Sequence, residues 1–191
     1  MIFRQIALFE KTGEHNTPDC VEILKKAVSQ GISKHVVVAS TSGRNAQAFF
    51  NALKGTDSNL VIVTHSANFK EENHDEFDEA TRKHLRENNV PVYTGTILTH
   101  SLEKSIMEKF GENTTAMIIA GTLRRFGEGA KVCIEIVMEA CDAGLVPEGA
   151  EVLAVAGTGH GSDTVMLIKS RPSKRFLDLE VLEILAMPRG R

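Results

Sequence analysis

The stretch His35-Val-Val-Val-Ala-Ser40-Thr41-Ser42-Gly43-Arg44-Asn45-Ala46 connects a predicted strand to a predicted helix through a turn of small hydroxyl residues and glycine. The β-branched run at positions 36–38 is typical of a parallel strand that is covered on both faces. Apolar residues then recur at helical spacing, at positions 46, 49, 50 and 53. The sequence therefore predicts a strand over 35–40 and a helix over about 43–53.

A turn of this kind favours the binding of an anion at the start of the helix. It leaves backbone N–H groups without intrahelical partners at the positive end of a helix dipole. The side chains of Thr41, Ser42 and Arg44 can add donors of their own. The same residue types also cap helices that bind nothing, and Gly43 can serve the turn alone. The segment is neither a Walker motif nor a Gly-x-Gly-x-x-Gly dinucleotide fingerprint, so an anion site and a ligand-free cap both fit it.

The rest of the chain alternates strands and helices. Further strands are expected at 60–64, 90–93 and 151–156, and helices at about 17–30, 76–87, 102–110, 116–126 and 130–143. Residues 164–169 and 176–186 are both strand-like with no helix between them, which predicts at least one antiparallel strand. We therefore expect one α/β domain over residues 1–191, with three α/β/α layers and a mixed, mostly parallel sheet.

Four segments follow predicted strands, and parallel strands place their carboxyl ends on one edge of the sheet, where open α/β sheets bind ligands. The loop at 157–161 is glycine-rich, but a strand and not a helix follows it, so the dinucleotide interpretation fails there. The candidate binding residues at this edge are Ser40, Thr41, Ser42, Gly43, Arg44, Asn45, Thr64, His65, Ser66, Gly95, Thr96, Gly157, Thr158, Gly159 and Asp163, and a helical segment adds Gly121, Thr122 and Arg124.

Several of these candidates have alternative roles. Arg44 can pair with a phosphate in a bidentate manner, and it can equally be a solvated side chain. His65 can contact a bound ring or carry a proton, and it can equally make a structural hydrogen bond. Asp163 can cap a turn or bind ligand hydroxyls. No catalytic set and no metal-ligand set emerges from the sequence. The three cysteines, Cys20, Cys133 and Cys141, show no C-x-x-C spacing and are expected in the core.

Composition limits the classes of molecule that this protein is expected to bind. The chain has 191 residues, 42% of them hydrophobic and 25% charged, with a net charge of −3 and both signs mixed along it. The absence of a basic stripe argues against nucleic acid, and no apolar segment is long enough to span a bilayer. Without a secretory signal pattern, we expect a cytoplasmic protein with a small-molecule ligand and no membrane partner.

Two motifs carry a family resemblance. The 41–46 turn resembles the Thr-x-Ser-Gly-Arg-Ser-Ala turn of the pyruvate kinase C-terminal domain, with Asn45 where that domain has serine or threonine. Gly144-Leu-Val-Pro-Glu-Gly-Ala-Glu-Val-Leu-Ala-Val-Ala-Gly157 resembles its helix end, turn and next strand, and the order agrees across roughly residues 17–170. With Phe9-Glu10-Lys11 and Ala120-Gly121-Thr122-Leu123-Arg124-Arg125, the whole chain is more similar still to a stand-alone, mostly uncharacterised family of pyruvate kinase C-terminal-domain-like proteins.

The resemblance implies a function. In pyruvate kinase the similar domain holds a regulatory sugar phosphate and performs no chemistry, and the catalytic barrel is absent here, so no pyruvate kinase activity is expected. The stand-alone relatives resemble binders of flavin mononucleotide (FMN), which would place a phosphate at 42–45 and the flavin ring along the strand ends. We therefore expect an FMN-binding flavoprotein, either without activity or as a small flavin-dependent oxidoreductase. The alternatives are a non-catalytic sensor or carrier of a phosphorylated metabolite such as a sugar phosphate, and an assembly domain that forms a homo-oligomer.

Overall fold

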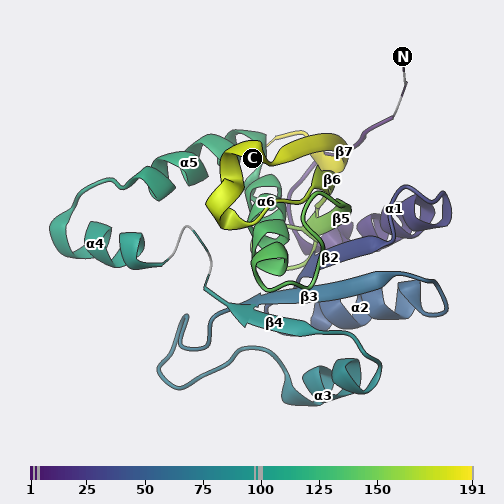
Figure 1. Cartoon of the computed structure of the whole chain (residues 1–191), viewed down its shortest axis with the longest axis horizontal. Coiled ribbons are helices and arrows are strands. Elements are labelled where there is room, and N and C mark those ends of the chain that lie inside the picture. Colours follow the sequence, from purple (N-terminus) through teal and green to yellow (C-terminus); the bar gives the residue numbers. More distant parts are fainter. Residues whose placement is uncertain (2, 4, 97, 99–100, 191) are drawn as a thin grey trace.

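A computed structural model describes residues 1, 3, 5–96, 98 and 101–190. It contains a seven-stranded sheet in the order β1-β7-β6-β5-β2-β3-β4 (Figure 1). Only the two pairings made by β6, with β5 and with β7, are antiparallel among the described pairs. The mixed, mostly parallel α/β sheet is thus confirmed. The strands are β1 (Ala7–Phe9), β2 (His35–Ala39), β3 (Asn59–His65), β4 (Val92–Gly95), β5 (Glu151–Ala156), β6 (Thr164–Lys169) and β7 (Glu180–Pro188).

The helices lie close to where hydrophobic periodicity predicts them. In the described part of the chain, none is long and apolar enough to cross a membrane. The α-helices are α1 (Thr17–Ser29), α2 (Arg44–Leu53), α3 (Glu79–Glu87), α4 (Leu102–Phe110), α5 (Thr115–Leu123) and α6 (Glu128–Asp142), and short 3-10 turns are η1 (Glu14–Asn16), η3 (Arg124–Phe126) and η4 (Ser173–Asp178).

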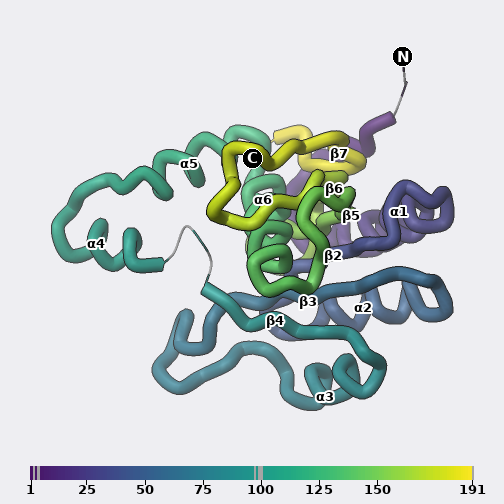
Figure 2. The backbone as a smooth tube through the Cα atoms, in the orientation of Figure 1, coloured from purple at the N-terminus to yellow at the C-terminus, as the bar shows by residue number. Residues whose placement is uncertain are grey.

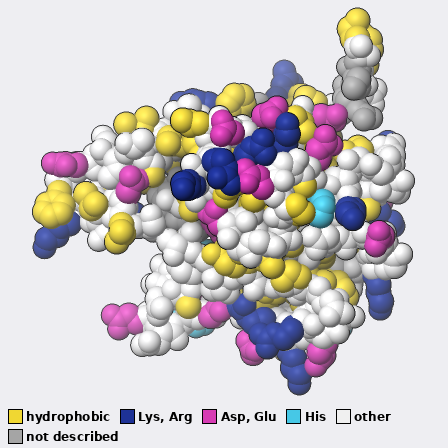
Figure 3. Space-filling view, viewed as in Figure 1, with side chains coloured by type: hydrophobic (Ala, Val, Ile, Leu, Met, Phe, Trp, Pro, Cys, Tyr) yellow, Lys and Arg dark blue, Asp and Glu magenta, His cyan; other side chains and the backbone are white. Residues whose placement is uncertain are grey.

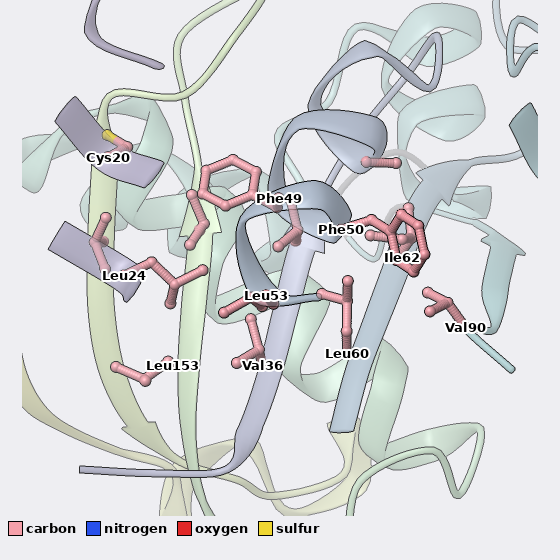
Figure 4. Packing of buried hydrophobic residues seen from close by; sticks show 14 of the residues in the cluster. Cys20, Leu24, Val36, Phe49, Phe50, Leu53, Leu60, Ile62, Val90 and Leu153 are labelled. Atoms are coloured by element: carbon pink, nitrogen blue, oxygen red, sulfur yellow. The ribbon is translucent and has the colours of Figure 1, made fainter. Parts of the chain in front are cut away.

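Strand β2 shows why the core has two parts. Val36, Val37 and Val38 are fully buried, and successive side chains of a strand point to opposite faces. Val36 and Val38 join a cluster with residues of α1, α2 and α3, of which Figure 4 shows the α1 and α2 side. Val37 joins a second cluster built mainly from α6 and the strands. The helices therefore bury β2 from both faces.

Helices α4 and α5 form an arm that we define as residues 101–126. The chain leaves the sheet after β4, runs out through α4 and returns through α5 to α6 (Figure 2). No described residue of α4 is buried, and only Ala120 is buried in α5. Exposed apolar side chains therefore remain on the arm, including Leu102, Phe110 and Ile118, and hydrophobic side chains are visible on its surface in Figure 3.

Three predicted boundaries were wrong. The helix expected from residue 76 begins later, because Asp78 caps it by accepting a hydrogen bond from the Thr81 N–H. The helix expected over 116–126 changes to the 3-10 turn η3 after Leu123. The strand expected over 176–186 begins only at Glu180, because η4 occupies the positions before it. Cys20 and Cys133 are buried as expected, whereas Cys141 is only partly buried.

Replacing Phe49 with alanine tests the α2 side of the core. The Phe49 ring is fully buried, so its loss should lower the free energy of unfolding by about 3–5 kcal/mol. The matched control is Ile118→Ala on the arm, where the side chain is 63% exposed, and its effect should stay within about 0.5 kcal/mol. Urea denaturation measures both, and equal losses would contradict the assigned core.

Candidate functional site

The turn between β2 and α2 leaves backbone donors without intrahelical partners. The Ser40 Oγ accepts a hydrogen bond from the Ala46 N–H at 3.2 Å, and the Gln47 N–H donates to the Gly43 carbonyl at 3.0 Å. Arg44 and Asn45 come before Ala46 in the first turn of α2, so their N–H groups have no intrahelical acceptor. Together with the α2 dipole, they make the start of α2 favourable for an anion.

Gly43 shapes this turn. Its φ of +92° lies in the left-handed region, and a Cβ there would stand 3.1 Å from Thr81 Cγ2 of α3. The Asp78 N–H donates to the Ser42 carbonyl at 3.3 Å, which adds a second contact between the turn and the start of α3. The turn is therefore held against α3 and is not a free loop.

The segment that follows β5, residues 157–163, closes over the same end of the sheet. The Asn45 Nδ2 donates to the Ser162 Oγ at 3.1 Å, which joins this loop to α2. The Ser162 N–H donates to the Thr17 Oγ1 at 2.9 Å, which joins it to α1. The N-cap residue of α1 is Asn16, and the hydroxyl of the next residue, Thr17, holds the loop.

The Asp163 carboxylate accepts hydrogen bonds from other groups of the protein. Its buried carboxylate accepts hydrogen bonds from the N–H groups of Gly13 at 2.9 Å and Thr158 at 3.1 Å. Its other oxygen accepts one from the Thr164 hydroxyl at 2.8 Å. These bonds fit the structural alternative for Asp163, since the side chain anchors the loop and does not line the cavity.

His65 at the end of β3 has an acidic partner. Its Nε2 lies 3.2 Å from Oε2 of Glu76, and its ring packs against Phe69 with the centroids 4.3 Å apart. Lys70 Nζ donates to the other oxygen of Glu76 at 2.6 Å. The imidazole is 12% exposed and borders the cavity, so it can contact a ligand while Glu76 orients it.

Helix α6 forms a charged wall of the cavity. Lys131 Nζ lies 2.9 Å from a carboxylate oxygen of Glu128 and 2.9 Å from one of Glu135, although the lysine side chain is only 2% exposed. One turn further on, Glu139 is 3% exposed, and burial raises its pKa from 4.5 to about 8, with further contributions from Glu135 and Asp142. Its carboxyl is therefore mostly protonated at neutral pH.

These groups surround one cavity of about 620 Å³, a size in the range of small-molecule sites. It lies between the carboxyl ends of β2 and β3 and the charged side of α6. Arg44 borders it with a side chain that is 72% exposed and 3.9 Å from Glu14. The sequence-predicted residues that line it are Ser40, Thr41, Ser42, Arg44, Asn45, Thr64, His65, Gly157 and Gly159.

The other predicted site residues lie outside the cavity lining. Gly43 packs beside Thr81 of α3, and the Thr158 N–H donates to Asp163 within the loop after β5. The end of β4 does not reach the cavity: Gly95 packs tightly beside the Tyr93 ring, and neither Gly95 nor Thr96 lines the cavity. Ser66 lies past the end of β3 and is also outside the lining. On the arm, the Thr122 hydroxyl donates to the Ile118 carbonyl, and Arg124 Nε lies 2.5 Å from Glu128, which lines the cavity. Gly121 lies on α5 with Thr122, and it does not line the cavity.

Sequence reasoning missed the charged wall. Lys131, Glu135 and Glu139 recur every four residues in a helix that is otherwise apolar, which was a usable signal. Such a stripe is usually a solvated face, and only the three-dimensional arrangement shows that it is buried. Glu76 was missed because the loop between β3 and α3 brings it back to His65. No protein-family model matches the chain.

The loop after β5 gives a stability prediction. A Cβ at Gly161 would stand 2.2 Å from Glu14 Cα, and φ is +76°. Gly161→Ala should therefore lower the free energy of unfolding by about 2–4 kcal/mol. Gly159→Ala is the control, because φ there is +71° with nothing within 4 Å, and its cost should be about 1 kcal/mol. Equal costs in urea denaturation would show that the close approach to Glu14 is not required.

Glu139 gives a pH prediction. Between about pH 4.5 and 8 the native state keeps a proton that the unfolded state releases, so wild-type stability declines as pH rises through this window. The Glu139→Gln variant has an amide that does not titrate in this window, so its stability lacks this pH dependence. The unfolding free energy of the variant minus that of the wild type should therefore grow with pH, by a few kcal/mol at most. Urea denaturation across the window measures it, and a pH-independent difference would contradict a buried neutral carboxyl.

Proposed function

We propose that this protein binds FMN, a flavin phosphate, in the cavity between α6 and the carboxyl ends of β2 and β3. The observation that carries the proposal is the start of α2, whose donors border a cavity of about 620 Å³. The choice of a flavin among phosphorylated ligands is supported by the sequence resemblance. We also propose the three-layer fold of the stand-alone pyruvate kinase C-terminal-domain-like family, which the same resemblance supports.

The phosphate would bind at residues 41–45. The N–H groups of Arg44 and Asn45 and the hydroxyls of Thr41 and Ser42 offer hydrogen-bond donors there. Arg44 can add a bidentate, charge-assisted pair, and its present partner Glu14 is 3.9 Å away and largely exposed. An exposed ion pair of this kind contributes little, so exchanging it for a phosphate costs little.

The remaining part of the cavity suits a ring system that is mostly apolar with a few polar atoms. Val63, Val132 and Ile136 line it with aliphatic surface, and the paired rings of His65 and Phe69 border it. A bound flavin would supply redox chemistry, and these residues would orient its ring. An activity as a small oxidoreductase is therefore the enzymatic form of the proposal.

The second candidate is a non-catalytic sensor or carrier of a sugar phosphate. Its support is the same phosphate-accepting turn, together with hydroxyl-bearing Ser40 and Thr64 at the cavity. The two candidates differ in what must fill the space beside α6, where a sugar would leave the aliphatic walls uncovered. The proposal also includes a cytoplasmic location, no nucleic-acid partner and a homo-oligomer, for which the exposed apolar residues of α4 are the support.

Binding of FMN can be measured directly. Titration of FMN with the purified protein should quench or shift flavin fluorescence. Riboflavin lacks the phosphate and should therefore bind at least tenfold more weakly, a difference of about 1.4 kcal/mol in binding free energy. Ser42→Asp should lose most of the FMN affinity, because its carboxylate would occupy the same donors and repel the phosphate.

The control for this variant is Ser58→Asp, since Ser58 lies outside the cavity, before β3. Ser58→Asp should bind FMN as the wild type does, and both variants should retain the wild-type melting temperature within a few degrees. Protein that takes up no FMN but is stabilised by a sugar phosphate in thermal-shift assays would favour the second candidate. Equal affinity for FMN in Ser42→Asp would exclude the α2 turn as the phosphate site.

A further inference from the structure

Glu139, whose side chain lines the cavity, has a carboxyl oxygen without a hydrogen-bond partner among the described residues. This oxygen, Oε2, is buried. Buried polar atoms in folded proteins nearly always have a hydrogen-bond partner. An unpartnered carboxyl at the edge of a cavity therefore points to a partner that the ligand supplies.

The neighbouring lysine does not take that place. Lys131 Nζ stands between Glu128 and Glu135, at 2.9 Å from an oxygen of each, so two of its three donors are occupied there. Its charge lowers the pKa of Glu139, but burial and the carboxylates of Glu135 and Asp142 outweigh it and raise that pKa to about 8. The carboxyl of Glu139 consequently has a proton to donate near neutral pH.

The other charged groups around the cavity belong to different elements. Glu14 and Arg44 pair at the entrance, and His65 and Lys70 are both within ion-pair distance of Glu76. His160 is exposed on the loop after β5. Among the described residues, the charged groups that shift the pKa of Glu139 are Glu135, Asp142 and Lys131, which all come from α6.

We propose that the Glu139 carboxyl donates a hydrogen bond to an uncharged acceptor of the ligand, a carbonyl oxygen or a ring nitrogen, on the part that carries no phosphate. This inference rests on the proposed function for the occupancy of the cavity. Lys131, the cation of the same wall, already lies 2.9 Å from the carboxylates of Glu128 and Glu135, so a second anionic group would have to compete with both for it. The site therefore selects a monophosphate with a neutral heterocyclic or carbonyl-bearing end, and disfavours bisphosphates.

The test uses FMN as the probe with the full-length protein. FMN dissociation constants are measured for the wild type, Glu139→Gln, Glu139→Leu and the control Glu22→Gln, whose side chain is exposed on α1. The pH runs from about 7 to about 9, which keeps the phosphate dianionic because its second pKa is about 6. Melting temperatures at each pH confirm that every variant is folded.

The expected results separate donor loss from a general disturbance. At pH 7, Glu139→Leu should bind FMN about tenfold more weakly than the wild type, since it has no donor. Glu139→Gln keeps an N–H donor, so it should bind within about threefold of the wild type and show no pH dependence. Wild-type affinity should fall about tenfold as pH rises through 8, and Glu22→Gln should follow the wild type.

Two contrary results are distinguishable. If Glu139→Leu binds FMN with the wild-type affinity and pH profile while Ser42→Asp does not bind, the donor role of Glu139 is overturned and the proposed phosphate site stands. If the wild type binds neither FMN nor inorganic phosphate, the proposed function fails and the role of Glu139 falls with it.

Discussion

Two segments that are far apart in the chain, the turn at Gly13 and the loop after β5, meet at the buried carboxylate of Asp163. It accepts N–H groups from Gly13 and Thr158 and the hydroxyl of Thr164, and burying a carboxylate without such donors would be strongly unfavourable. The loop after β5 is thereby fixed between η1 and the start of β6. Gly161 then lies against Glu14 so closely that no side chain fits. The rim of the cavity consequently depends on this carboxylate as well as on the strand ends, because it sets where the loop can stand relative to α2.

Helix α6 meets two requirements at once. Cys133, Val137 and Ala140 are fully buried and complete the core, while Lys131, Glu135 and Glu139 are buried on the side that faces the cavity. The charges are tolerated in different ways: Lys131 is satisfied by two carboxylates, and Glu139 is kept neutral by its raised pKa. An apolar stripe of similar volume would often be at least as stable, so stability alone does not explain these residues. Buried titratable groups with perturbed pKa values beside a cavity are typical of functional sites.

The sequence predicted the strands from β2 to β7, α2 and the antiparallel end of the sheet, because continuous β-branched runs and regular apolar spacing are local signals. The α2 turn was also found locally, since its donors follow from helix geometry. By contrast, the partnership of His65 with Glu76 depends on how a long polar loop folds back. The burial of the α6 stripe depends on what covers that helix, and a run such as 176–186 is strand-like by composition although its first residues form η4. These outcomes are tertiary and are not encoded in any single window of sequence.

The two sides of the cavity differ in charge, and this difference limits what can occupy it. At the start of α2, backbone donors and Arg44 favour an anion, and the facing Glu14 is held only by an exposed contact of 3.9 Å. At α6, Lys131 is already paired with the carboxylates of Glu128 and Glu135, which leaves an anion little to gain, and the protonated carboxyl of Glu139 offers a hydrogen bond. A ligand that is anionic throughout would bind favourably at α2 and unfavourably at α6. A ligand that is neutral throughout could accept the hydrogen bond at α6 but would leave the donors of α2 without an anion. Only a molecule with an anionic group at one end and an uncharged polar group at the other matches both sides at once.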